Sequence, residues 1–108
     1  MAAAFVLLVE VHLHVGESQS LKSKRQVVRS VKDALRERLG AAVAEVEGQD
    51  TWQRATLLCA LVGREEAELQ HRADALEEIV VARAGEDVAF ERTLRSLEDA
   101  RTDFPDTD

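Results

Sequence analysis

Residues 5–39 read FVLLVEVHLHVGESQSLKSKRQVVRSVKDALRERL, and this stretch decides the fold. Its first eleven residues have the two-residue period of a half-buried strand, with one wholly apolar face. Ser20 is a suitable N-cap for the helix that follows, and Gly40 is suited to end it. The predicted apolar stripe of this helix comprises Leu21, Val28, Val31, Leu35 and Leu39.

The rest of the chain predicts strand, strand, helix and strand. Strands are expected over residues 41–47 and 52–62, joined by a short turn, and therefore as a hairpin. A second helix with an acidic outer surface is expected over residues 64–83, ended by Gly85. With a last strand, the order β-α-β-β-α-β predicts an α+β, ferredoxin-like sandwich. In this fold two helices cover one face of a four-stranded antiparallel sheet.

The segment after the second helix is less regular. Val88, Phe90 and Leu94 suggest a last strand interrupted by Arg92, but Leu94, Leu97 and Ala100 fit a helical turn equally well. From residue 98 onward the chain is acidic and poor in apolar side chains, which is typical of disorder. We therefore expect a single ferredoxin-like domain over residues 1–97 and a disordered acidic tail over residues 98–108.

Composition restricts the compartment and the partners. A chain of 108 residues can bury a core without disulfides, and its single cysteine, Cys59, lies in an apolar run typical of a buried position. We expect a reducing, cytoplasmic location. No apolar run approaches the length needed to cross a bilayer, so no membrane partner is expected.

Positive charge is concentrated in the first helix. Residues 21–39 hold seven of the fourteen lysines and arginines and carry +5, although the whole chain carries -7. Five of these cations share one side of the helix, next to the apolar stripe, and we call them the basic ridge: Lys22, Arg25, Arg29, Lys32 and Arg36. Lys24 lies nearer the apolar side, where its stem can cover apolar surface while its ammonium group reaches water.

Three motifs carry a family resemblance. They are Ser20-Leu-Lys-Ser-Lys-Arg25, Val43-Ala-Glu-Val46 and Gln49-Asp-Thr-Trp-Gln-Arg-Ala-Thr56. With these motifs the chain, from about Phe5 to Leu94, resembles the YlxP-like family of small bacterial proteins, a domain of unknown function. The resemblance implies a ferredoxin-like fold and, from the family's gene neighbourhood, a role near ribosomal RNA. It supplies no catalytic residues.

The basic ridge favours contact with RNA phosphates, since a row of cations on a helix can meet successive phosphates. We therefore expect a non-enzymatic accessory protein of translation or ribosome maturation, bound to ribosomal RNA or a ribosomal particle and not to DNA. An RRM-like mode is disfavoured because the two central strands offer only Trp52 as a possible outward ring. The alternative is a homodimer or other interaction module that uses the open sheet face, without nucleic acid. The candidate phosphate contacts are Lys22, Lys24, Arg25, Arg29, Lys32 and Arg36.

The hairpin motif is a second candidate site of unknown role. Its polar side chains could form a ligand site with the tryptophan as a wall, or the aspartate could cap the turn while the tryptophan covers an edge of the core. The structural interpretation is favoured because the apolar area of tryptophan alone explains its presence. The residues concerned are Gln49, Asp50, Trp52, Gln53 and Arg54.

Metal binding and catalysis find little support in the sequence. Glu10, His12 and His14 alternate on one strand face and could direct three ligands to a metal, but imidazoles on an open sheet are more often surface or interface groups. We assign no metal ligand and no cofactor. The chain has no nucleophile elbow, P-loop or dinucleotide-binding glycine pattern, so no enzymatic activity is expected.

Overall fold

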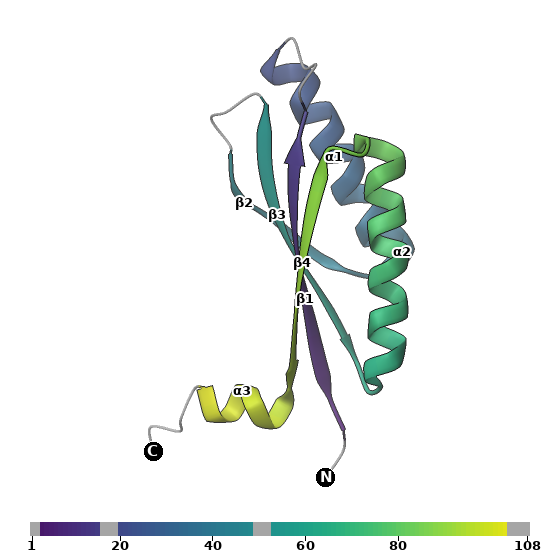
Figure 1. Ribbon diagram of the computed structural model, residues 1–108, viewed down its shortest axis with the longest axis vertical. Helices are drawn as coiled ribbons and strands as arrows, with labels where there is room; N and C mark the ends of the chain where they lie inside the picture. The colour runs from purple at the N-terminus through teal and green to yellow at the C-terminus, as the bar shows by residue number, and fades with distance from the viewer. Residues whose placement is uncertain (1–2, 16–19, 49–52, 104–108) are drawn as a thin grey trace.

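A computed structural model describes residues 3–15, 20–48 and 53–103. Its four strands form one antiparallel sheet in the order β2-β3-β1-β4, which confirms the ferredoxin-like α+β prediction (Figure 1). The elements are β1 (Phe5–His14), α1 (Leu21–Leu39), β2 (Ala42–Glu47), β3 (Arg54–Gly63), α2 (Glu66–Ala84), β4 (Val88–Ser96) and α3 (Leu97–Asp103).

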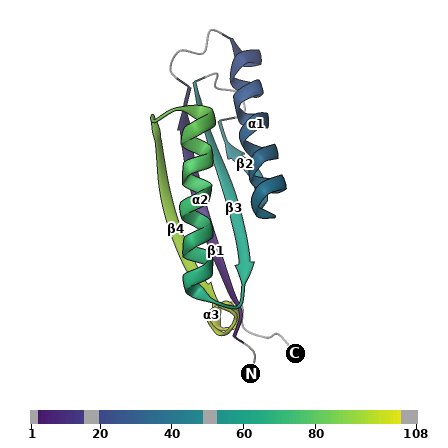
Figure 2. The same ribbon diagram turned by 90° about the vertical axis from the view of Figure 1, so that its right-hand side faces the viewer.

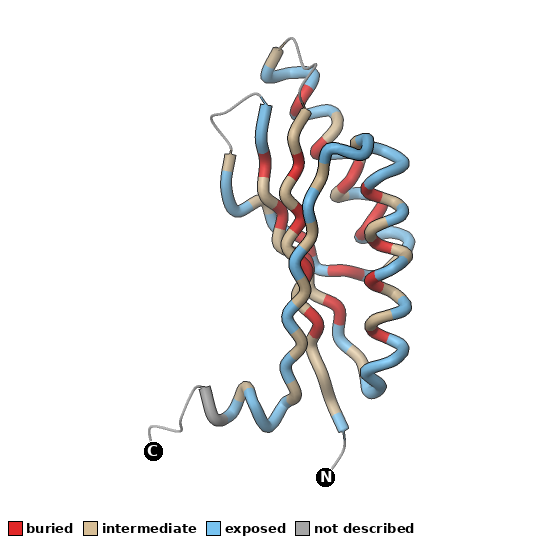
Figure 3. The backbone as a smooth tube through the Cα atoms, in the orientation of Figure 1, coloured by how far each residue is buried: buried red, intermediate tan, exposed pale blue. Residues whose placement is uncertain are grey.

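Helices α1 and α2 cover the same face of the sheet, and the opposite face is open (Figure 2). Buried residues concentrate between the sheet and these two helices (Figure 3). Alternate residues of the two central strands point inward, as the period-two pattern predicts. None of the helices within the described residues is long and apolar enough to cross a membrane.

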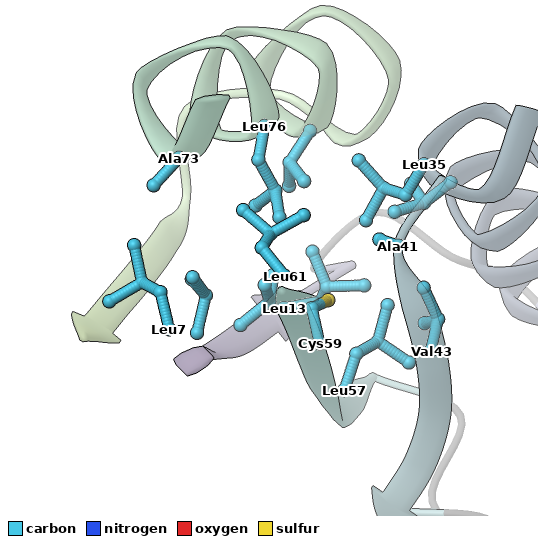
Figure 4. Packing of buried hydrophobic residues seen from close by; sticks show 14 of the residues in the cluster. Leu7, Leu13, Leu35, Ala41, Val43, Leu57, Cys59, Leu61, Ala73 and Leu76 are labelled. Carbon is cyan, nitrogen blue, oxygen red and sulfur yellow. The ribbon is translucent and has the colours of Figure 1, made fainter. Parts of the chain in front are cut away.

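The core is aliphatic and draws on every strand and both long helices. Side chains of the sheet and the helices meet closely, with the Cys59 thiol among them (Figure 4). The fully buried positions of the central strands are Leu7, Val9, Val11, Leu57, Cys59 and Leu61. Their helical counterparts are Val31, Leu35, Leu69, Ala73, Leu76 and Val80.

Helix α1 has the predicted bounds because both of its ends are capped. The Ser20 hydroxyl accepts a hydrogen bond of 3.1 Å from the Ser23 N–H. Gly40 adopts a left-handed conformation with φ 63°, and its N–H donates to the Arg36 carbonyl at 3.1 Å. These caps fix where the helix begins and ends.

The predicted stripe of α1 is wrong at its first position. Leu21 is 39% exposed, and Lys24 is buried in its place, one turn before Val28. The buried residues of the helix are Lys24, Val28, Val31, Ala34 and Leu35.

Strand β4 is continuous, so the expected interruption at Arg92 is wrong. Arg92 lies opposite Val9 on the helix side of the sheet, and its guanidinium reaches acceptors on α2. It donates to Asp74 Oδ1 at 2.8 Å and to Glu77 Oε2 at 2.8 and 3.0 Å, and to the side chain of Gln70 at 2.7 Å. The hydrogen bond to Asp74 is the largest of the effects that together raise the pKa of Arg92. The arginine therefore joins strand to helix.

Residues 98–103, expected in a disordered tail, belong instead to the short helix α3. A reciprocal capping box starts it: the Ser96 hydroxyl accepts from the Asp99 N–H at 3.0 Å, and the Asp99 carboxylate accepts from the Ser96 N–H at 3.2 Å. The Ser96 backbone hydrogen bond lowers the pKa of Asp99. The Leu97 N–H also donates to the Ala4 carbonyl at 2.9 Å, which ties the helix to the start of β1.

Candidate nucleic-acid interface

The basic ridge forms one continuous row along α1. Its members are spaced three and four residues apart, so they follow each other along one side of the helix. With a rise of 1.5 Å per residue, the row from Lys22 to Arg36 is about 21 Å long. Lys32 is half-buried and the other four cations are exposed. The predicted arrangement of these five residues is therefore present.

The ridge borders a hollow between α1 and β2. This hollow encloses about 280 Å³. Four of the five ridge cations line it, so positive groups converge on one concave surface instead of pointing apart. The remaining lining residues include the two acids Asp33 and Glu45, with Val28 as an apolar wall. The ridge cations that line the hollow are Arg25, Arg29, Lys32 and Arg36.

Arg36 holds the helix against the edge strand. Its Nη2 donates a hydrogen bond of 2.7 Å to the Val43 carbonyl of β2. Strand β2 is at the edge of the sheet, where backbone groups lack a neighbouring strand. A guanidinium has five N–H donors, so this bond leaves others for a ligand in the hollow. Arg36 therefore fixes the position of the ridge relative to β2.

Lys24, one of the candidate phosphate contacts, is buried, so the expectation that its ammonium group reaches water is wrong. Its side chain is only 1% exposed, and its ammonium group donates to the Gly48 carbonyl and lies 3.6 Å from Glu45 Oε2. It therefore joins the start of α1 to the end of β2. The sequence held a signal for this role, because Lys24 lies four residues before the buried Val28.

Three of the ridge cations have no such internal partner. Within the part of the chain that the structure describes, no ion pair or hydrogen bond engages the side chains of Lys22, Arg29 or Lys32. Their charges therefore contribute to an unbalanced positive potential on this side of the domain. Such a potential attracts anions and gives salt-dependent binding.

The hairpin motif is only partly visible. Gln49, Asp50 and Trp52 lie outside the described residues, so their predicted roles stay predictions. Gln53 and Arg54 are exposed, and the Gln53 carbonyl accepts from the Val15 N–H at 2.7 Å.

Gly48, just before this motif, approaches β3 closely. Its φ is 89°, and a Cβ there would lie 2.4 Å from the Arg54 carbonyl oxygen. Lys24 binds the carbonyl of this same glycine. The helix motif and the hairpin motif are therefore linked through one backbone position.

The open sheet face offers no aromatic platform. Among the described residues, its two central strands present no phenylalanine, tyrosine or tryptophan; Phe5 and Phe90 lie on the helix side. Stacking of bases on a sheet requires such rings. The outward residues of these strands are Val6, Leu8, Glu10, His12, His14, Arg54, Thr56, Leu58, Ala60 and Val62.

Cys59 is unsuited to nucleophilic chemistry. It is buried in the core, and burial raises the pKa of its thiol to about 11. The thiol is therefore protonated at neutral pH, and the thiolate is the nucleophilic form.

A family model described as Protein of unknown function (DUF503) matches residues 6–93. The chain belongs to this family. The DUF503 match begins in β1 and ends in β4, so it covers the ridge and the hairpin motif and leaves out α3. No curated protein matches the chain.

Among solved structures, the DUF503 chain is similar to a de novo designed protein, Foldit4. The two are 9% identical with a TM-score of 0.53, over 85% of this chain and 96% of that one. At this identity the likeness concerns the fold alone. The finer YlxP-like assignment remains a prediction.

Proposed function

We propose that this protein is a non-enzymatic accessory factor of translation or ribosome maturation that binds ribosomal RNA or a ribosomal particle in the cytoplasm. In this proposal the basic ridge contacts the RNA, and it binds the phosphate groups of the RNA backbone. The observation that carries the proposal is the convergence of Arg25, Arg29, Lys32 and Arg36 on one hollow. The resemblance to the YlxP-like family supports the choice of a ribosomal partner.

The mode of binding follows from the side chains available. Arginine and lysine contact phosphate oxygens without reading sequence, so the ridge fits the shape and backbone of a folded RNA. Arg36 is held at the edge of β2, which limits the freedom of its guanidinium before RNA arrives. Preorganised cations lose less conformational entropy on binding than free ones.

Sedimentation of extract from cells that produce the protein tests this proposal. At low salt the protein should migrate with ribosomal particles, and crosslinking with RNA sequencing should recover ribosomal RNA. A ridge variant should stay at the top of the gradient, whereas a control that removes equal charge elsewhere should migrate normally. Migration of both variants with particles would refute the ridge as the contact. The ridge variant is Arg25→Gln, Arg29→Gln and Lys32→Gln; the control is Arg38→Gln, Arg64→Gln and Arg101→Gln.

The second candidate function is a homodimer through the open sheet face. One end of this face is apolar, and Val62 is 70% exposed there. On the neighbouring strand β1, Val6 lies opposite Val62 and Leu8 lies opposite Ala60, so they extend this apolar surface. Contiguous exposed apolar surface of this kind favours association of two copies.

Mass measurement in solution separates the two functions. If the sheet face is the interface, Leu58→Glu should convert a dimer to a monomer and leave RNA binding intact. The ridge variant should remain a dimer and lose RNA binding. A monomer at every concentration tested would refute the dimer. The two functions are compatible, since they use different faces of the domain.

A further inference from the structure

Two glutamates face each other on the open sheet, away from the basic ridge. Glu10 of β1 and Glu91 of β4 are directly opposite in the antiparallel register, so their side chains share one face. Like charges directly opposite in a sheet repel. Neither carboxylate forms an ion pair with a lysine or arginine in the described ranges 3–15, 20–48 and 53–103. The pair therefore lacks a fixed counter-charge from such a side chain.

An imidazole points between these carboxylates. His12 Nε2 is 3.9 Å from Glu10 Oε1 and 3.9 Å from Glu91 Oε2. This separation exceeds hydrogen-bond range, so no proton is shared directly between the ring and either carboxylate. The other ring nitrogen, Nδ1, lies 3.3 Å from Thr56 Oγ1 on β3. When Nδ1 donates its proton to Thr56, the lone pair of Nε2 faces both carboxylates, which are acceptors only.

The three ligand atoms enclose a space suited to a cation. They lie within 4.8 Å of one another. Zinc binds imidazole nitrogen and carboxylate oxygen at about 2.0–2.2 Å, which puts its ligands about 3.3 Å apart in a tetrahedron. The ligand atoms must therefore move closer together to bind zinc. Glu10 is half-exposed and Glu91 is exposed, so rotation of their side chains can bring the carboxylates to this spacing without movement of the strands. The open sheet face leaves the fourth position to water.

We propose that Glu10, His12 and Glu91 form a zinc site on the open face of the sheet, with Thr56 orienting the imidazole. The donor set, one nitrogen and two oxygens, suits zinc. His14 takes no part, because its Nδ1 is 2.5 Å from Asp87 Oδ2. The third ligand comes from β4, which the sequence pattern of β1 alone does not reveal.

Calorimetric titration of the full chain with zinc chloride tests the site, after removal of any histidine tag and of bound metal. One zinc ion per chain should bind. Glu91→Gln and His12→Asn should each weaken binding at least about tenfold. The matched controls His14→Asn and His71→Asn should bind within about twofold of the unmodified chain. The absence of binding near one equivalent would overturn the proposal.

Thermal unfolding supplies a second readout that separates a metal site from a structural cluster. Zinc should raise the Tm of the unmodified chain because it binds the folded state. Glu91→Gln should raise the Tm of the metal-free protein, since it removes the like-charge pair, and should abolish the zinc-dependent rise. A zinc-dependent rise that persists in both Glu91→Gln and His12→Asn would overturn the assignment.

Discussion

Lys24 provides the sharpest test of how the ridge is held in place. Lys24→Met keeps most of the aliphatic stem and removes the ammonium group. The Gly48 carbonyl then loses its donor, at about 1–3 kcal/mol for an unsatisfied buried acceptor. Glu45 loses its partner at 3.6 Å. Removing one partner of a fully buried pair costs about 3–5 kcal/mol, but Glu45 is 13% exposed and can recover some hydration.

We therefore expect Lys24→Met to lower the free energy of unfolding by about 3 kcal/mol. Urea denaturation followed by circular dichroism measures this change. Lys22→Met, on the exposed side of the same helix, is the matched control and should change stability by less than about 0.5 kcal/mol. An effect of Lys24→Met as small as that of the control would refute the structural role of Lys24.

A double-mutant cycle with Glu45→Gln isolates the pair. Once Lys24 is replaced, Glu45 has lost this counter-charge, so removal of the glutamate charge should cost less than it does in the unmodified chain. The two changes should therefore differ from additivity by about 0.5–3 kcal/mol. Strict additivity would show that the two side chains do not interact. RNA binding should show the opposite pattern. Lys22→Met should reduce the magnitude of the slope of log RNA affinity against log salt by about 0.7, and folded Lys24→Met should leave this slope unchanged.

Three further predictions concern positions outside the ridge. Gly48→Ala should lower the free energy of unfolding by about 2 kcal/mol, because the Gly48 backbone is left-handed and the new Cβ would meet the Arg54 carbonyl. Urea denaturation measures this change, and an unchanged urea midpoint would contradict it. Arg92→Met should lower the free energy of unfolding by about 1.5–3 kcal/mol, since acceptors on α2 lose their donor, whereas the exposed Arg64→Met should be neutral. The Cys59 thiol should react with a disulfide reagent at pH 8 only after unfolding. Rapid labelling of the folded chain would refute the burial of this thiol. Because burial raises the pKa of Cys59 from an ordinary 9.0 to about 11, the contribution of the protonated thiol to stability should be present below pH 9 and be lost as the pH rises through 11.

The fold was predictable because its signals are local. The apolar alternation in β1 and the caps Ser20 and Gly40 place one strand and one helix from short stretches of sequence. The chain order then leaves few topologies for a four-stranded sheet. The capping box at Ser96 and Asp99 is equally local, yet the acidic composition of the segment concealed it.

Two of the errors share a physical cause, which is a polar side chain whose partner lies on a distant element. Arg92 looked like a break in a strand because its acceptors on α2 precede it by 15 to 22 residues. Lys24 looked solvent-exposed because its acceptor lies 24 residues later. Its helical spacing from Val28 places Lys24 on the buried side, but a lysine is seldom buried unless it is paired, so its burial could be predicted only together with the distant acceptor.

The candidate site also combines features that local sequence predicts with features that depend on distant elements. Helical spacing alone places the five ridge cations on one side of α1. The hollow that gathers four of them depends on where β2 lies, and the carboxylate that completes the zinc cluster depends on the register of β4. The apolar alternation of β4 indicates which of its residues share the open face, but not which of them lies opposite Glu10.

The dependence of RNA affinity on salt tests the central claim most directly. The dissociation constant of the purified chain for ribosomal RNA is measured over a salt series. If all five ridge cations meet phosphates, log affinity against log salt should have a slope of about -3.5, since each contact on single-stranded or irregular RNA contributes about -0.7. Replacement of the five ridge cations by glutamine should bring the slope close to zero in a chain that remains folded. A near-zero slope for the unmodified chain, or no binding at low salt, would contradict the account.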